Sequence, residues 1–193
     1  ISRELSGTYD NAYIAKNMVE GINITIIDTL TTVSILTGMV FSAAKLALAG
    51  ASVNEIVSKI DSIKANWSYY LTVDDLTSLV KNGRLSNAKK FIANILRIKP
   101  LIKFSQDGKL IAIQNVRTYK GAMKEIVNKV VKEVDPLKGV VHISYANNEE
   151  DFKFIEALVR EALPNTPIEV YQLPATISAH LGLAAIGVGY INY

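Results

Sequence analysis

The sequence predicts an α/β fold, because runs with the periodicity of strands alternate with runs of helical periodicity. Short segments rich in β-branched residues are separated by longer ones whose apolar residues recur every three to four positions. The 193 residues suit one large or two small domains, and 49% apolar residues are enough for a globular core. We predict the C-terminal portion of a first α/β domain over residues 1–66 and a second α/β domain over 67–193.

The first unit contains one predicted strand, at 22–27, between a helix that begins near Asp10 and an apolar helix over 30–49. Ser52, followed three residues later by Glu55, predicts a capping box at the start of a third helix. A lone strand does not make a sheet, and the chain starts at Ile1 without a methionine or a signal-like segment. We therefore expect the N-terminal part of this domain to be missing.

The helix over 30–49 is long enough to cross a membrane, and its apolar residues reach nearly all round it. Several hydroxyl side chains, Lys45 and an immediate Gly50 argue against a membrane span. We expect a buried helix of a soluble protein.

The second unit contains six predicted strands with helices between them. The two strands around Asp107-Gly108 form a plain hairpin signal. This pattern predicts a mainly antiparallel or mixed sheet with flanking helices. The predicted strands cover 67–73, 98–104, 109–116, 140–145, 168–173 and 188–193, and the predicted helices cover 76–80, 87–96, 119–134, 148–163 and 177–185.

The segment Leu-Ser-Gly-Thr-Tyr at 5–9 is the first candidate site. The first N–H groups of a helix lack partners and favour an anion, and Gly7 lets a ligand approach the backbone. Ser6 has a hydroxyl that can cap the helix and also hold a polar head group. On residue types alone, the simpler interpretation is favoured, in which Ser6 or Thr8 acts only as a helix cap.

Three further side chains are candidates. His180 is expected near a helix start among small residues, suited to an anion or carboxyl group, although a structural histidine is the competing interpretation. Arg84 follows Gly83 at a turn, which favours phosphate or carboxylate binding, against the alternative of a surface arginine. His142 lies within an apolar strand and is expected to be structural.

Composition excludes several chemistries. The chain has no cysteine and two histidines, so a catalytic thiol is excluded and a histidine metal site is not expected. No nucleophile elbow, phosphate-binding loop or zinc-protease motif occurs, and Ser6 has no base beside it. We therefore predict no catalytic residue, metal or cofactor.

A block without acidic residues between Asp75 and Asp107 favours an anionic partner or substrate, or else a solvated basic face. Nucleic acid is not expected, because interleaved aromatic residues and a DNA-binding motif are lacking. The basic side chains in the block are Lys81, Arg84, Lys89, Lys90, Arg97, Lys99 and Lys103.

Seven short motifs, taken in order, resemble the DegV family over nearly the whole chain. They are Leu-Ser-Gly-Thr-Tyr at 5–9, Ile-Ile-Asp-Thr at 26–29, Val-Asp-Asp-Leu at 73–76, Gly-Arg-Leu-Ser at 83–86, Ile-Lys-Pro at 98–100 with Asp107-Gly108, Val116-Arg117, and His-Leu-Gly at 180–182. The resemblance implies a two-domain protein that binds a long-chain fatty acid between its domains. In bacterial members it implies the acyl-carrying subunit of fatty acid kinase, whose separate kinase subunit phosphorylates the carboxylate.

Carried onto this sequence, the resemblance implies that Ser6, with Gly7 and Thr8, and His180 bind the carboxylate. Arg84 would contact the acyl phosphate or the kinase. It further implies a cytoplasmic lipid carrier without catalysis of its own, and peripheral membrane contact stays open. Leu183 and Ala184 replace the Pro-Gly that the family pattern places after the histidine and glycine. The alternative is a subunit like that of dihydroxyacetone kinase, which would hold a small ketone on a histidine.

Overall fold

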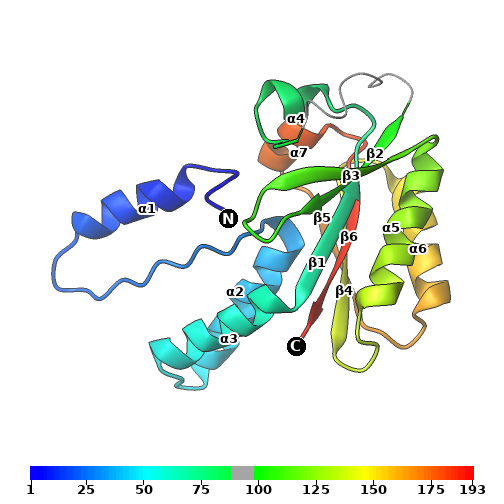
Figure 1. Ribbon diagram of the computed structural model, residues 1–193. Coiled ribbons are helices and arrows are strands. Elements are labelled where there is room, and N and C mark those ends of the chain that lie inside the picture. The colour runs from blue at the N-terminus through cyan, green and yellow to red at the C-terminus, as the bar shows by residue number, and fades with distance from the viewer. Residues whose placement is uncertain (88–97) are drawn as a thin grey trace.

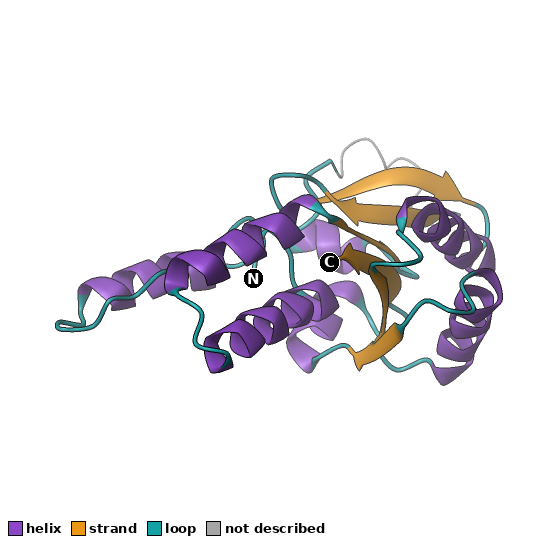
Figure 2. Ribbon diagram, turned by 90° about the horizontal axis from the view of Figure 1, so that it is seen from below, coloured by secondary structure: helices purple, strands orange, loops and turns teal. Residues whose placement is uncertain are grey.

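The computed structural model describes residues 1–87 and 98–193 and shows a six-stranded sheet between two layers of helices (Figures 1 and 2). The strand order is β3-β2-β1-β6-β4-β5. Only β4 and β5 pair in parallel, and every other neighbouring pair is antiparallel. The prediction of six strands in a mainly antiparallel sheet is confirmed. The strands are β1 (Trp67–Thr72), β2 (Lys99–Phe104), β3 (Leu110–Val116), β4 (Gly139–Tyr145), β5 (Ile168–Gln172) and β6 (Ile186–Asn192).

The helices divide between the two faces and one end of the sheet (Figure 1). α2 (Val33–Leu48) and α3 (Val53–Ala65) cover one face, and α5 (Tyr119–Glu133) and α6 (Glu149–Ala162) cover the other. The short helices α4 (Thr77–Lys81) and α7 (Ala175–Leu181) lie together at one end, and α1 (Thr8–Asn17) projects away from the sheet.

Side chains of the central strand β1 point alternately to the two faces of the sheet, and the core is divided into two clusters. Tyr69 and Leu71 of β1 belong to a cluster with Ile35 and Met39 of α2, whereas Tyr70 packs with α5 on the opposite face. Successive strand residues point to opposite faces, so one strand serves both layers. The division of the chain at residue 66 remains a prediction, and residues from both sides of it share the first cluster.

Local signals in the sequence match the structure at several element ends. The capping box of Ser52 and Glu55 is present at the start of α3. The hairpin between β2 and β3 turns through Gly108. Its φ of 83° lies in the left-handed region, which glycine adopts without steric cost because it has no side chain. The predicted helix at 87–96 lies almost wholly outside the described residues.

Two sequence predictions for the first unit need correction. Residues 22–27 form no strand but an extended link, because no described strand pairs with them. The helix predicted over 30–49 is α2, and it is buried on one side only: Ile35 and Met39 are fully buried, whereas Phe41 is 64% exposed. The sheet covers only one stripe of a helix. Within the described residues, no helix is long and apolar enough to cross a membrane.

Candidate functional site

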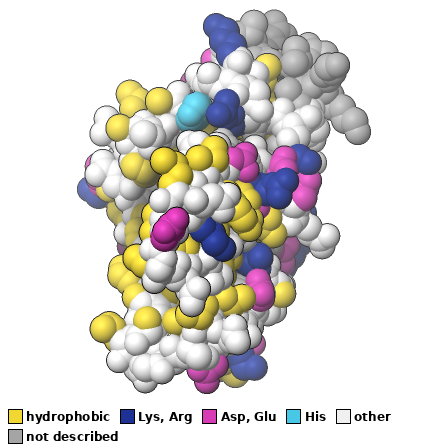
Figure 3. Space-filling view, turned by 90° about the vertical axis from the view of Figure 1, so that its left-hand side faces the viewer, with side chains coloured by type: hydrophobic (Ala, Val, Ile, Leu, Met, Phe, Trp, Pro, Cys, Tyr) yellow, Lys and Arg dark blue, Asp and Glu magenta, His cyan; other side chains and the backbone are white. Residues whose placement is uncertain are grey.

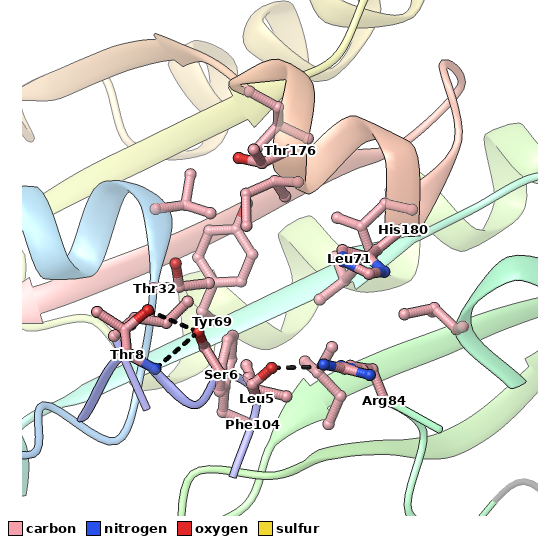
Figure 4. A pocket seen from close by; sticks show the side chains of 17 residues that line it. Leu5, Ser6, Thr8, Thr32, Tyr69, Leu71, Arg84, Phe104, Thr176 and His180 are labelled. Atoms are coloured by element: carbon pink, nitrogen blue, oxygen red, sulfur yellow. Dashed lines mark hydrogen bonds between the residues drawn. The ribbon is translucent and has the colours of Figure 1, made fainter. Parts of the chain in front are cut away.

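A cavity of about 330 Å³ lies over the α2 face of the sheet and collects most of the predicted site residues (Figure 4). The N-terminal turn, the start of α2, three strands, α4 and α7 contribute to it. Its polar lining residues are Ser6, Thr8, Thr32, Arg84, Thr176 and His180, and its apolar ones are Ile1, Leu5, Val33, Tyr69, Leu71, Leu79, Phe104, Leu110, Leu173, Ile177 and Leu181. The turn at 5–8 and His180 therefore share one cavity, although they are far apart in sequence.

The turn that carries Ser6 is tied to two other parts of the chain by the buried Ser2. The Ser2 hydroxyl donates to the carbonyl of Gly108 at 2.8 Å, and its N–H donates to the carbonyl of Thr31 at 2.8 Å. The Ser2 carbonyl in turn accepts the N–H of Ser6 at 3.2 Å. A Cβ on Gly108 would lie 2.4 Å from the Ser2 Oγ, so only glycine leaves room for this contact.

Ser6 and Thr8 form a hydroxyl pair at the beginning of α1. The two hydroxyl oxygens are 2.8 Å apart, and the Thr8 N–H donates to Ser6 Oγ at 3.2 Å (Figure 4). Gly7, between them, has nothing within 4 Å of a would-be Cβ. Ser6 therefore accepts a hydrogen bond at the start of α1 and also lines the cavity.

Arg84 spans from the loop after α4 to the N-terminal turn. Its Nη1 donates to the carbonyl of Asn82 at 2.6 Å, and its Nε donates to the carbonyl of Leu5 at 3.3 Å. The side chain is exposed and lies at the cavity rim. Two carbonyls therefore orient a guanidinium whose remaining donors face solvent or a ligand.

His180 lies in the last turn of α7, which corrects the expectation of a helix start. α7 begins directly after Pro174, whose φ of −66° suits a helix beginning, and ends before Gly182 with φ 85°. His180 Nδ1 is buried and has no hydrogen-bond partner in the described residues. In Figure 4, Arg84 and His180 lie on the opposite side of Ser6 from Thr8.

Tyr69, one residue of the apolar cavity wall, packs against two glycines of β6. A Cβ on Gly187 would come within 2.5 Å of the Tyr69 hydroxyl, and one on Gly189 within 2.5 Å of its ring. Burial raises the pKa of Tyr69 from its ordinary value of 10 to about 12. Phe104 packs edge-on against the Tyr69 ring, with centroids 6.2 Å apart.

Sequence reasoning missed four notable lining residues, Thr32, Thr176, Tyr69 and Phe104. The available sequence signal was the pair Gly187 and Gly189 in β6, which leaves room for a large side chain such as Tyr69 on the neighbouring strand. Val33 also lines the cavity and has a φ of 54°, which is strained for a β-branched residue. The backbone at Val33 is thus held in an unfavourable conformation beside the cavity.

The arrangement suits binding of an anion with an apolar body. The hydrogen bonds of the Ser6 side chain go to Thr8 and to no histidine or carboxylate, so the described residues show no activated serine. Among the described residues, no group of three or more His, Asp or Glu side chains is placed to hold a metal ion.

Hydrophobic side chains are also exposed on α1 and α2. Tyr13 and Ile14 of α1, Met18 directly after it, and Val40 and Phe41 of α2 are all at least 43% exposed. Figure 3 shows hydrophobic side chains gathered over this side of the molecule, with a histidine beside a basic side chain above them.

Of the predicted basic block, Arg84 lines the cavity and Lys99 forms an ion pair with Asp74. Lys89, Lys90 and Arg97 lie outside the described residues. His142 is confirmed as a buried residue of β4, away from the cavity.

Fold and cavity together define an α/β protein with a mixed sheet and a ligand pocket on one sheet face. The chain belongs to the DegV family: the family model described as "Uncharacterised protein, DegV family" matches residues 1–193. A DegV domain-containing protein of Staphylococcus aureus is 30% identical over all of this chain, and one of Listeria monocytogenes is 30% identical over 97% of it. The chain spans about two thirds of the length of these relatives (67% and 66%).

Solved structures of DegV family proteins share the fold. A fatty acid binding DegV family protein from Streptococcus agalactiae superposes with a TM-score of 0.90 at 27% identity, over all of this chain and 68% of that one. DegV of Bacillus subtilis, a fatty acid binding protein, gives 0.85 at 28% identity with the same coverage. The fatty acid kinase B3 protein of Streptococcus pneumoniae, loaded with linoleic acid, gives 0.87 at 25% identity over all of this chain and 70% of that one.

Proposed function

We propose that this chain binds a long-chain fatty acid, with the carboxylate at Ser6, Gly7, Thr8 and His180 and the tail along the apolar wall of the cavity. One observation carries the proposal: a single cavity combines hydroxyls, an imidazole and a guanidinium with a wall of apolar side chains. Its volume of about 330 Å³ lies at the lower end of the usual range for ligand pockets. The similarity to fatty acid binding relatives supports the same ligand.

The free energies of burying a fatty acid tail and its carboxylate agree with a lining that is mostly apolar and partly polar. Burying roughly 14 methylenes at about 0.8 kcal/mol each gives on the order of 10 kcal/mol before the cost of association. A buried carboxylate opposes binding unless donors replace its water. We take the hydroxyl proton left over in the Ser6–Thr8 pair and the imidazole of His180 as these donors.

We further propose that the chain presents the carboxylate to a partner kinase subunit and has no catalytic residue of its own. Arg84 supports this function, because its exposed guanidinium stands at the rim with donors left over. A guanidinium binds phosphate oxygens in a bidentate geometry and suits an acyl phosphate or an acidic kinase surface. The proposal places the protein in the cytoplasm with such a kinase.

The proposal is tested by extracting lipid from the purified protein and identifying it by mass spectrometry. We expect about one long-chain fatty acid per chain in the wild type and less in the Ser6→Ala and His180→Ala variants. Thr37→Val is a matched control, because Thr37 bonds within α2 and does not line the cavity. A protein that contains no fatty acid and takes none up would refute the proposed ligand.

Kinase presentation is tested separately. A purified fatty acid kinase catalytic subunit is mixed with the loaded protein and a phosphate donor, and the acyl phosphate is trapped with hydroxylamine. We expect the product to form with the wild type and to fall with His180→Ala. If the loaded protein supports no acyl phosphate formation, its function is limited to lipid binding. A small covalent adduct on His180 would instead favour the ketone-binding alternative.

A further inference from the structure

We infer that Thr8 is a positioning residue, which makes the Ser6 hydroxyl a dedicated hydrogen-bond donor and so selects an ionised carboxylate over a neutral head group. This inference rests on the proposed function and adds to it a source of selectivity within the same site. It starts from the geometry of two hydroxyls that belong to one turn.

A serine hydroxyl has one proton to donate and two lone pairs that accept. One lone pair of Ser6 Oγ already accepts the Thr8 N–H at 3.2 Å. The Thr8 hydroxyl oxygen is 2.8 Å from the same atom, and either hydroxyl can be the donor. When Thr8 donates, both lone pairs of Ser6 are occupied and its proton is left over. Ser6 can then only donate to a ligand.

An anion in the cavity selects this arrangement. A carboxylate is an acceptor only, so it stabilises the state in which the Ser6 proton points toward it and the Thr8 proton points toward Ser6. Hydrogen bonds in such a chain polarise one another, and a bond to an ion is stronger than one to a neutral group. An alcohol gains less, because its own proton finds no acceptor on Ser6.

The surrounding turn holds the pair in place. The Ser6 N–H is bonded to the Ser2 carbonyl, and Arg84 Nε donates to the carbonyl of Leu5, the residue before Ser6. Thr8 is also the first residue of α1, and its backbone N–H reaches Ser6 whatever its side chain is. A change confined to the Thr8 hydroxyl therefore removes one donor and leaves the turn intact.

The test compares Thr8→Val and Thr8→Ser with the wild type, using palmitate and its matched alcohol, hexadecanol, as probes. Valine keeps the shape of threonine without its hydroxyl, whereas serine restores the hydroxyl. We expect Thr8→Val to weaken palmitate binding by about 3- to 10-fold, the worth of one hydrogen bond, and to change hexadecanol binding by less than about 2-fold. Thr8→Ser should return palmitate affinity to within about 2-fold of the wild type.

Three outcomes would overturn the inference: unchanged palmitate affinity in Thr8→Val, an equal loss for both probes, or no recovery in Thr8→Ser. An equal loss for both probes would assign Thr8 a merely structural function at the helix start. Failure of the wild type to bind palmitate at all would instead refute the proposed function. Thr37→Val again serves as the control, with both affinities expected to stay at the wild-type level.

Discussion

Acidification should destabilise this protein through one buried histidine, His142. The side chain is fully buried between β5 and α2, and neither ring nitrogen has a hydrogen-bond partner in the described residues. Glu169 lies 3.4 Å from Nδ1, the Tyr171 ring stacks on the imidazole, and Tyr193 stands nearby over Gly38. Burial outweighs the attraction of Glu169 and lowers the pKa of His142 to about 4 from the ordinary value of 6.5.

The sign and size of the stability loss follow from the difference between the pKa values of His142 in the folded and unfolded chain. The unfolded chain binds a proton near pH 6.5 and the folded one only near pH 4, so stability is complete above pH 6.5 and falls as the pH drops toward 4. A difference of about 2.5 pKa units is worth about 3 kcal/mol in total, of which about 2 kcal/mol is lost between pH 7.5 and pH 5.

The assay is urea unfolding at pH 7.5 and pH 5, for the wild type and His142→Gln. The wild type should lose about 2 kcal/mol more free energy of unfolding than His142→Gln, which has no proton to take up at this position. The comparison uses the pH dependence of each protein, so a packing defect in His142→Gln cancels. An equal loss in both proteins would refute the reasoning.

Three further predictions concern packing, capping and the cavity rim. Gly187→Ala places a methyl group within 2.5 Å of the Tyr69 hydroxyl, so chemical denaturation should show a loss of about 1–3 kcal/mol in the free energy of unfolding. Fatty acid binding should weaken as well, and an unchanged affinity would mean that Tyr69 does not line the binding site. Ser52→Ala removes the capping box of α3 and should cost about 1 kcal/mol of stability while leaving lipid binding intact, and a stability equal to the wild type would show that the cap contributes nothing. Arg84→Lys keeps the charge but loses the planar fork, so acyl phosphate formation should fall by at least about 10-fold while palmitate affinity, measured in parallel, changes by less than about 3-fold. Equal effects of Arg84→Lys on both would place Arg84 in lipid binding instead.

The sequence was most informative where local chemistry decides the structure. The hairpin at Asp107-Gly108 and the capping box at Ser52 each depend on neighbouring residues, and both are observed. The six strands predicted within 67–193 are observed as well. The segment 22–27 was mispredicted because its composition suits a strand, whereas a strand also needs a partner that composition cannot supply. The exposure of Phe41 has the same origin, since apolar character alone does not show which side of α2 meets the sheet.

The candidate site could be predicted only in part. Ser6, Thr8, Arg84 and His180 were found from motif chemistry and the DegV resemblance, and they line one cavity. Of the apolar wall, the apolar helix over 30–49 was expected and contributes Val33, but Tyr69 was not foreseen, because it belongs to the wall through its contact with Gly187 of the neighbouring strand. That contact depends on strand order, which places β1 beside β6, the last strand of the chain. Long-range pairing of this kind leaves little trace in a single sequence.

The central claim is that a fatty acid carboxylate binds between the Ser6–Thr8 pair and His180. Its most direct test is the carbon-13 resonance of palmitate labelled at the carboxyl carbon, recorded with the wild-type protein and with Ser6→Ala, His180→Ala and Thr37→Val. A bound carboxyl resonance should appear at a position distinct from free palmitate, move in the two site variants and stay unchanged in Thr37→Val. A bound resonance indifferent to both Ser6 and His180 would contradict the account.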